Sequence, residues 1–465
     1  MSSTVESPAT ETGSPGRDRP PLRRERSPLL TSEDWWAVWL GLGLVALAVV
    51  LWLAGGSVKT FAPSLPKWSG WAELGAGLGQ RWPSVIALFI LYAAIFAVAA
   101  HFLGVRAGSF LGGFSVLFVL SIAIVVFSQW KVANQYNLEA PIVALVLGLI
   151  VGNTIHIPSW FGDALRTELY VKVGVILLGA TLPFTLVVKA GPVALLQASV
   201  IATATFLTIY FVGVKGFHLD KRFAATLAAG GSICGVSASI AVGSAVKSRK
   251  EHVSAAMSLV VVWAVIAIFA LTILSKAFGL PNGVAGAWIG TSEFADAAGI
   301  TAASSFGEAG VQAFTLVKVV GRDIFIGVWS LILALIAVNV WDRKDRRDGQ
   351  PGSEKVRTGQ VWERFPKFVI GFFVASIGLT VLIAVAGASR AAGIDALVTL
   401  PVKELRTWAF TLTFLSIGLT TRFRELSSVG WRPVATFSIG AVVNIVLGLL
   451  LSAVVLGGYW GRLGS

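Results

Sequence analysis

Cysteine is almost missing from this chain of 465 residues, since Cys234 is the only one. A single cysteine excludes an internal disulfide framework, a cysteine-rich zinc site and an iron–sulfur cluster. The chain also has only four histidines, spread widely along it, which argues against a metal enzyme. We therefore expect neither a metal site nor a cofactor.

Charged residues are also scarce, at 13% of the chain against 55% hydrophobic residues. That balance is too apolar for a soluble globular protein. Long apolar runs recur, and each is near the ~20 residues that one bilayer crossing needs. The sequence therefore predicts an all-α polytopic membrane protein with about 11–13 transmembrane segments.

The formal net charge of +13 is unevenly placed, because much of it lies in the N-terminal tail and between Arg343 and Lys367. Such an excess of Lys and Arg is typical of cytoplasmic loops. The charge therefore indicates orientation and not a nucleic-acid partner. We expect a multi-pass protein of the plasma membrane with a cytoplasmic N-terminus, and the lipid bilayer as its surroundings.

The motifs of soluble enzymes are missing. The sequence has no phosphate loop, no nucleophile elbow, no His-Glu-x-x-His motif and no soluble domain large enough for an ATPase. We therefore expect that the protein is not an enzyme. Any transport would draw its energy from ion gradients or from the gradient of the substrate.

Composition divides the chain into five regions. These are a disordered cytosolic tail (1–34), N-terminal spans (35–129), a transport core (140–340), a basic cytosolic loop (342–367) and C-terminal spans (368–457). Two segments of the core, 223–246 and 284–310, are interrupted by small and polar residues, so we expect a broken or re-entrant helix in each. The tail and the basic loop both belong in the cytosol, and this parity holds if both segments cross the membrane or if both re-enter.

The first interrupted segment carries the most unusual stretch of the chain. Three glycines and three serines fall between Ala228 and Ile240, inside an apolar run. Glycine weakens a helix interior, and backbone groups freed in hydrocarbon must find other partners. Many transporters build a substrate site from such broken helices. Candidate substrate-binding residues of the two segments are Gly230, Gly231, Ser232, Gly235, Ser237, Thr291 and Ser292. The alternative is a small-residue seam for close helix packing.

Charged side chains at membrane depth are the other candidates. Lys318 and Arg322 are four residues apart and share a helix face, where they would attract an anion. Asp323 could neutralise one of them, which would leave a net positive site. Glu293 and Asp296 are three apart and could carry protons or sodium, because burial favours the neutral carboxyl. The alternatives are a structural charge network around Lys318 and a water-exposed position for the two carboxylates.

An internal repeat is visible near the ends of two spans. Leu178–Gly191 resembles Ile417–Gly430, with Gly179 aligned to Gly418 and Phe184 to Phe423. By parity the two copies run in opposite directions. The pattern predicts inverted repeats.

Several motifs together resemble a known family. In chain order they are Leu149-Ile-Val-Gly-Asn153, Val173-Gly-Val-Ile-Leu-Leu-Gly179, Ala229-Gly-Gly-Ser-Ile-Cys-Gly-Val-Ser-Ala238, Thr315-Leu-Val-Lys318 and Ser416-Ile-Gly-Leu-Thr420. Over roughly residues 140–456 the chain resembles the YeiH-type membrane proteins, also called the sulfate exporter family. The resemblance implies a fold of the sodium/proton-antiporter and bile-acid-symporter type, with inverted repeats, two broken helices, a core and a scaffold domain, and often a homodimer.

The chain departs from that family at three places. Family members carry a Ser-x-His-acid sequence in the second broken element, whereas Thr291–Asp296 contains no histidine. The arginine that follows the Lys318 equivalent is shifted by one position, to Arg322. The tail and the first span are additional. The first departure leaves the coupling ion open.

The sequence is compatible with three functions. The main hypothesis is a secondary transporter that exports a small anion such as sulfate or an organic sulfonate. The first alternative is a cation/proton antiporter that uses Glu293 and Asp296. The second alternative is a membrane receptor or scaffold that transports nothing.

Overall fold

The computed structural model describes residues 29, 32–135, 140–323, 332–333, 335–336, 366–421 and 430–463. The described residues form helices and no strand, with one isolated bridge between Trp68 and Trp130. The predicted all-α class is therefore confirmed. The predicted tail and the basic loop 342–367 lie almost wholly outside the described residues.

Seven helices in the described ranges are long and apolar enough to cross a bilayer, which makes this a multi-pass membrane protein. They are α2 (Glu33–Leu53), α3 (Trp71–Phe102), α4 (Ala107–Ser128), α9 with its π-helical extension η2 (Phe184–Gly216), α12 (Lys250–Ala277), α19 (Lys367–Ala386) and α22 with its extension η7 (Trp431–Val455).

The remaining helices are shorter or carry more polar residues. They are η1 (Val58–Phe61), α5 (Lys131–Gln135), α6 (Ala140–Thr154), α7 (Ser159–Gly162), α8 (Thr167–Thr181), α10 (Lys221–Ser232), α11 (Val236–Ala245), α13 (Asn282–Ser292), α14 (Asp296–Ser304), α15 (Gly307–Thr315) with its π-helical continuation η3 (Leu316–Arg322), α20 (Ala388–Ile394), η5 (Asp395–Thr399), α21 (Leu400–Thr420) and α23 (Gly457–Trp460). With α6, α8, α15–η3 and α21 counted as crossings, the seven become eleven, at the lower limit of the prediction.

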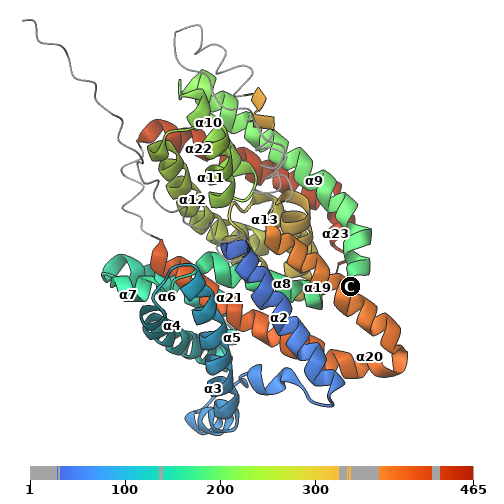
Figure 1. Ribbon diagram of the computed structural model, residues 1–465. Coiled ribbons are helices and arrows are strands. Elements are labelled where there is room, and N and C mark those ends of the chain that lie inside the picture. The colour runs from blue at the N-terminus through green and yellow to red at the C-terminus, as the bar shows by residue number, and fades with distance from the viewer. Residues whose placement is uncertain are drawn as a thin grey trace, which may run out of the picture.

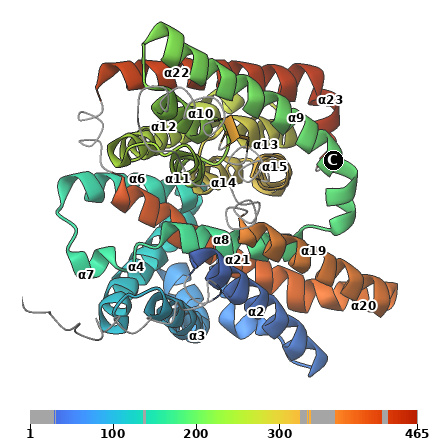
Figure 2. The same cartoon turned by 45° about the horizontal axis from the view of Figure 1, so that its top comes forward.

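The helices form two bundles, which Figure 2 shows one above the other. The scaffold bundle contains α2, α3, α4, α6, α8, α19 and α21, and the hairpin bundle contains α9 to α15, η3 and α22. Helix α14 of the hairpin bundle packs against α6, α8 and α21 of the scaffold. The bundles cut across the regions drawn from sequence, since α6 and α8 of 140–340 lie in the scaffold and α22 of 368–457 lies in the hairpin bundle.

The first broken segment folds back on itself (Figure 1). The Arg222 side chain donates to the Val246 carbonyl at 3.0 Å, so the outer ends of α10 and α11 lie together. Further in, a Cβ added at Gly243 would lie 3.3 Å from the Thr226 methyl group, and one added at Gly230 would overlap the Ser239 hydroxyl. These pairs follow an antiparallel register. The segment 221–245 is therefore a helical hairpin, the first hairpin.

The second broken segment has the same form. Helix α13 runs parallel to α15, because a Cβ at Gly286 would overlap the Gly310 carbonyl and one at Gly290 would lie 3.0 Å from the Phe314 carbonyl. Helix α14 runs antiparallel to α15, because Gly299 faces the Phe314 ring while Gly310 faces the Ala303 carbonyl. The segment 282–304 is therefore the second hairpin.

Helix α12 connects the two hairpins and fixes their directions. It has 28 residues and is therefore ~42 Å long. Its first turn lies beside the open end of the first hairpin, where Val253 faces Gly243, and its middle lies beside the tip, where Val260 faces Gly235. The second hairpin starts just beyond its other end. The two hairpins thus enter from opposite ends of α12, which fits the re-entrant alternative of the topology.

The predicted inverted repeat has a counterpart in helix directions. Helices α8 and α21 pack antiparallel, since Arg406 reaches Thr181 while Gly174 faces Phe410. Helices α9 and α22 also pack antiparallel, as three contacts show: Ile209 with Gly440, Thr205 with Asn444, and Gln197 with Ser452. Opposite directions of α8–α9 and α21–α22 are what an inverted repeat requires. Phe423 lies outside the described residues.

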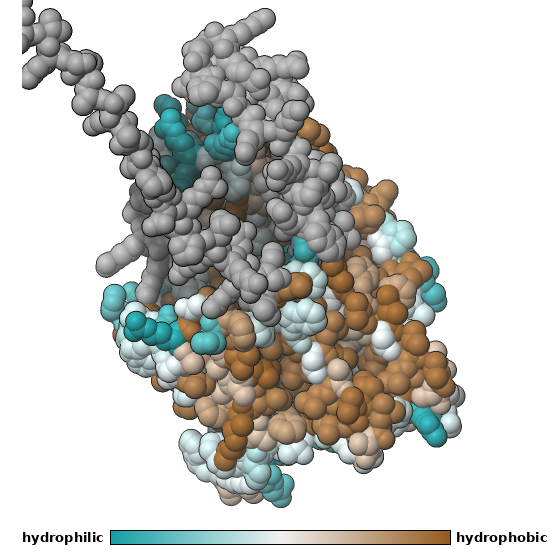
Figure 3. All heavy atoms as spheres, viewed as in Figure 1, coloured by the Kyte–Doolittle hydropathy of each residue, from teal (hydrophilic) through white to brown (hydrophobic). Residues whose placement is uncertain are grey.

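The outer surface over the scaffold bundle is largely apolar on the face shown in Figure 3. Helix α19 of this bundle has exposed aliphatic side chains, Val374, Val381 and Val385 among them. Such a surface suits contact with lipid hydrocarbon.

Candidate functional site

The tips of the two hairpins meet inside the hairpin bundle. The first tip, residues 233–235, turns through Ile233 (φ −114°, ψ −101°) and Gly235 (φ 72°), and the second tip comprises residues 293–295. A Cβ added at Gly235 would lie 2.8 Å from the Phe294 carbonyl oxygen. Glycine is required at this position because its φ is positive and because the second tip approaches so closely.

Lys318 of η3 holds the two tips together. Its ammonium group donates to the carbonyls of Ile233 (2.8 Å), Glu293 (3.1 Å) and Phe294 (3.2 Å), and the side chain is fully buried. An ammonium group has three donors. All three N–H donors of Lys318 therefore bond to backbone carbonyl oxygens that have no partner within the helix, because they lie at a helix C-terminus.

Arg322, one turn further along η3, does the same for the neighbouring carbonyls. Its Nε donates to Ser232 at 3.2 Å, and its Nη1 lies 2.6 Å from the Thr291 carbonyl and 2.9 Å from that of Glu293. These oxygens end α10 and α13. A helix C-terminus carries partial negative charge, so the two buried cations stabilise the two helix ends that point at each other.

The starts of α11 and α14 lie at the same tips and are left open. Neither start has a side-chain cap. The first amides of a helix have no partner within the helix, and they carry partial positive charge. Val236, Ser237, Ala295 and Asp296 are partly exposed, whereas the residues on either side of them are buried. The accessible part of the tips thus lies at the starts of α11 and α14.

Three carboxylates complete the cluster. Asp296 lies 3.6 Å from the Lys318 ammonium group, and its side chain is 13% exposed. Glu293 accepts from the amides of Phe294 (2.8 Å) and Ala295 (3.4 Å) through Oε1, while its Oε2 has no hydrogen-bond partner within the described ranges. Among the residues that the structure describes, both carboxylate oxygens of buried Asp323 also lack a hydrogen-bond partner, as does Nη2 of Arg322. Three acidic groups thus accompany two cations, whereas the sequence predicted a net positive site.

A metal centre is not assembled by these residues. Within the described ranges no group of three His, Cys, Asp or Glu side chains is placed to hold a metal ion. The one cysteine, Cys234, is buried in the first tip.

Several predicted substrate-binding hydroxyls are used elsewhere. Ser232 donates to the Ala228 carbonyl at 2.6 Å and Thr291 to that of Trp288 at 2.7 Å, so both bond back within their own helices. Ser292 donates to the Asn444 carbonyl at 3.5 Å. Ser232 and Thr291 take part in the site through their carbonyls, which accept from Arg322.

The predicted glycines divide into two groups. Gly235 shapes the first tip, whereas Gly230 and Gly231 serve packing. A Cβ at Gly231 would overlap Ile209, and the Phe437 ring lies 3.1 Å from that position. The predicted residues that the structure brings together at the tips are Gly235, Ser237, Glu293, Asp296, Lys318 and Arg322, and Asp323 follows Arg322 in the same cluster.

Sequence reasoning missed an ion-pair cluster that joins the two bundles. Glu308, at the start of α15, lies 2.9 Å from the Lys403 ammonium group and 3.1 Å from Nη2 of Arg406, both on α21. Arg406 also donates to the Thr181 hydroxyl at 3.0 Å. About a hundred residues separate Glu308 from Arg406 in the chain, so no local pattern could have paired them.

Comparison with known proteins gives one family. The family model described as Conserved hypothetical protein 698 matches residues 113–437. The UPF0324 membrane protein of Rhodopirellula baltica is 31% identical over 398 residues, which cover 85% of this chain and 72% of that protein. A UPF0324 membrane protein of Nitrosomonas europaea is 28% identical over 457 residues, with 87% and 91% covered.

A third relative, a UPF0324 membrane protein of Nitratidesulfovibrio vulgaris, is 30% identical over 375 residues, and the chain spans 63% of its length. No solved structure matches the chain. The matched region contains both hairpins and η3. The chain thus belongs to the family of membrane proteins described as Conserved hypothetical protein 698, the YeiH-like family that its motifs resemble.

Proposed function

We propose that the protein is a secondary transporter of a small anion, which binds where the two hairpin tips meet. The observation that carries this proposal is the pairing of helix ends at the tips. Both C-terminal ends are occupied by Lys318 and Arg322, while both N-terminal ends are uncapped and partly exposed. Uncapped helix starts suit an anion, since their amides point at it and their dipoles favour negative charge.

The two cations act mainly through charge in this proposal. Their donors are engaged with carbonyls, except Nη2 of Arg322, which lacks a partner. The amides of the first turns of α11 and α14, with the Ser237 hydroxyl, would hold the oxygens of the anion. Sulfate and organic sulfonates have oxygens that such amides bind, and the family resemblance favours the same class.

Asp296 is our candidate for the coupling group. It lies between the Lys318 ammonium group and the exposed side of the tips, so a proton or a sodium ion could reach it. Occupation of its carboxylate would change the charge felt by an anion a few ångströms away. Glu293 and Asp323, whose oxygens lack partners, would share this role.

Movement would occur between the two bundles. Helix α14 lines the tips and also packs against the scaffold, so a shift of the hairpin bundle would change which side of the membrane the tips face. We also propose a cytoplasmic N-terminus. The open end of the first hairpin carries Lys221, Arg222, Lys247, Arg249 and Lys250, which the positive-inside rule places in the cytoplasm.

Flux in proteoliposomes tests the proposal. We expect uptake of labelled sulfate or of an organic sulfonate by the wild-type protein, loss of that uptake in Lys318→Ala with the protein still folded in the membrane, and changed pH or sodium dependence in Asp296→Asn. Lys131→Ala changes an exposed lysine of α5, outside the hairpin bundle; it is the matched control and should behave as wild type. Unchanged uptake in Lys318→Ala would remove that residue from the site.

A cation/proton antiporter is the second candidate, and one observation favours it. The cluster holds three carboxylates against two cations, and several carboxylate oxygens have no partner. Sodium/proton exchange that needs no anion would support this candidate and contradict the first.

A receptor or scaffold without flux is the third. The tight packing around Gly231 and Ser232 favours it, while the partial exposure of Ser237 and Asp296 opposes it. If proteoliposomes showed neither anion flux nor sodium/proton exchange, the receptor or scaffold function would be the remaining candidate.

A further inference from the structure

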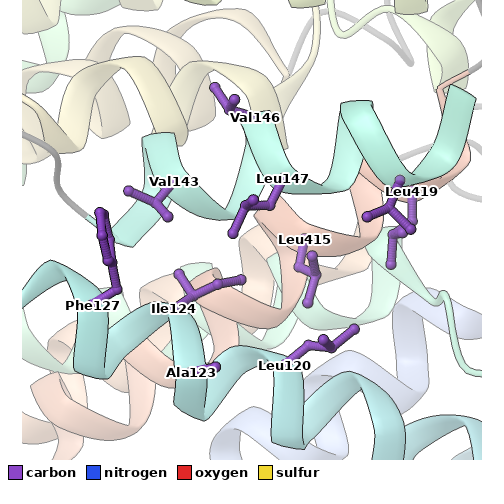
Figure 4. A pocket seen from close by; sticks show the side chains of 10 residues that line it. Leu120, Ala123, Ile124, Phe127, Val143, Val146, Leu147, Leu415 and Leu419 are labelled. Carbon is purple, nitrogen blue, oxygen red and sulfur yellow. The ribbon is translucent and has the colours of Figure 1, made fainter. Parts of the chain in front are cut away.

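An apolar groove runs over the scaffold bundle, and none of the residues that line it belongs to either hairpin (Figure 4). It lies between α4 and α6, with α21 behind them, and has a volume of about 500 Å³. Every described residue that lines it is apolar; Ala123 and Phe127 of α4, Leu147 of α6 and Leu415 of α21 are among them. A ligand with a charged or hydrogen-bonding part would find no partner inside.

The groove exists because α6 is held closely by α21 and not by α4. A Cβ at Gly148 or Gly152 would lie 2.8 Å from a backbone oxygen of α21, so these two helices are in backbone contact. Side chains of ordinary size keep α4 further away. Within the part of the chain that the structure describes, no side chain fills the space between α4 and α6.

The groove opens on the outside of the bundle. Phe127 is 39% exposed and Leu147 is 43% exposed, and apolar side chains continue beyond the groove at Val119 and Ile150. Because α4 is a candidate membrane span, this surface faces lipid hydrocarbon. The neighbour available to fill the groove is a lipid tail.

One end of the groove lies just below a membrane interface. Three residues after Phe127, Trp130 stacks on Trp68 at 5.9 Å, and Trp68 is 5.8 Å from Trp71. Lys131 follows, with its side chain 54% exposed. Tryptophans and lysines gather where hydrocarbon meets headgroups.

From Phe127 to Leu120, the groove follows α4 for ~10 Å at 1.5 Å per residue. One leaflet of the hydrocarbon core is roughly 15 Å deep, half of ~30 Å. The groove therefore fits within a single leaflet, with its upper end at the level of the headgroups.

We propose that the groove is a binding site for one acyl chain of a membrane phospholipid, whose headgroup lies at the level of Trp130 and Lys131. A flexible chain fills such a narrow space and restores the van der Waals contacts that an empty space would lose. A second copy of the protein is the competing occupant.

The test is the number of phospholipids that the protein keeps. Protein purified in mild detergent and supplied with phosphatidylethanolamine is examined by native mass spectrometry. We expect Ala123→Trp, which places an indole in the groove, to keep one phospholipid fewer than wild type. Leu147→Trp should act in the same way from α6. Val119→Trp, on an exposed position of α4 outside the groove lining, is the matched control and should keep the wild-type number.

Three outcomes would overturn the proposal. The first is equal phospholipid numbers in wild type and both groove variants. The second is an equal loss in Val119→Trp, which would show that the whole surface and not the groove retains lipid. The third is a wild-type protein that runs as a dimer while the groove variants run as monomers, since that would assign the groove to a second copy. Thermal unfolding of each variant in detergent confirms that folded proteins are compared.

Discussion

At the scale of residues, Lys318 and Arg322 are the two side chains on which the hairpin tips depend. Together they donate to carbonyls of both hairpins, and both are fully buried. In hydrocarbon, a backbone carbonyl without a donor costs several kcal/mol. The cations therefore make it possible for irregular backbone to exist deep in the hairpin bundle.

Arg322→Met tests this structural role separately from any transport. We expect a loss of about 3–5 kcal/mol in the free energy of unfolding, because the carbonyls of α10 and α13 lose their donors and nearby carboxylates lose their countercharge. Unfolding by sodium dodecyl sulfate in mixed micelles measures it. Lys131→Met removes a lysine that is 54% exposed and lies 3.8 Å from Glu73, so it should cost less than about 1 kcal/mol. Equal losses in the two variants would contradict the assigned role.

The shared face of Lys318 and Arg322 could be predicted from their spacing of four residues. Their partners could not, because Ile233 and Gly290 lie 85 and 32 residues away in the chain. The same limit applies to Ser232 and Thr291. Their hydroxyls looked like ligands in the sequence, yet in a helix a hydroxyl can bond to the preceding turn, and both do so.

At the scale of elements, the two hairpins are the features that sequence located best. The predicted broken segments 223–246 and 284–310 contain α10–α11 and α13–α14 to within a few residues. Glycine and serine in an apolar run indicate a break. They do not indicate whether the chain continues or turns back, because that depends on contacts such as Thr226 with Gly243.

Cysteine labelling from each side of the membrane tests the opposite directions of the hairpins. Lys250 and Lys276 are exposed and lie at the two ends of α12, so ~39 Å separates them along the helix. In a Cys234→Ser background, we expect Lys250→Cys to react with an impermeant maleimide only from the cytoplasmic side and Lys276→Cys only from the other.

Labelling of both positions from one side would contradict the arrangement. Labelling of each from the side opposite to the expected one would keep the hairpins and reverse the orientation of the N-terminus. Cys234 is buried, so its replacement by serine should leave the topology unchanged.

At the scale of the whole molecule, the Glu308 cluster is a direct connection between the bundles. Glu308 lies on the hairpin bundle, and Lys403 and Arg406 lie on the scaffold. The cluster is partly exposed, since the Glu308 side chain is 32% accessible. Its contribution to the contact between the bundles is therefore about 1 kcal/mol.

Glu308→Gln should loosen the contact between α14 and α21. We expect amide hydrogen exchange in these helices to rise about fivefold, the factor that about 1 kcal/mol represents when exchange follows local opening. Glu73→Gln, which alters an exposed pair within the scaffold bundle, is the control and should leave α14 unchanged. Equal exchange in the wild-type protein and Glu308→Gln would show that the cluster does not hold the bundles together.

The division into two bundles could not be predicted from the sequence. Composition divides the chain into regions that follow one another in sequence. The bundles do not follow that order, because α8 lies in the scaffold bundle and α9 in the hairpin bundle, although only a two-residue turn joins these helices. The inverted repeat could be predicted from the sequence, because Gly179 and Gly418 lie at equivalent positions near the ends of α8 and α21. Assignment of each copy to a bundle requires the packing of α8 on α21 and of α9 on α22.

The composition of α14 has a consequence for how the bundles meet. Apart from Asp296 and Ile300, its nine residues are all alanine, glycine, serine or threonine. Large side chains interlock as ridges in grooves and resist displacement, whereas small ones form a shallow surface. The contact of α14 with the scaffold is therefore shallow, and the movement between the bundles that we propose would not have to separate interlocked large side chains. In the proposed transporter, the same nine residues would both contact the bound anion and form the contact along which the bundles move.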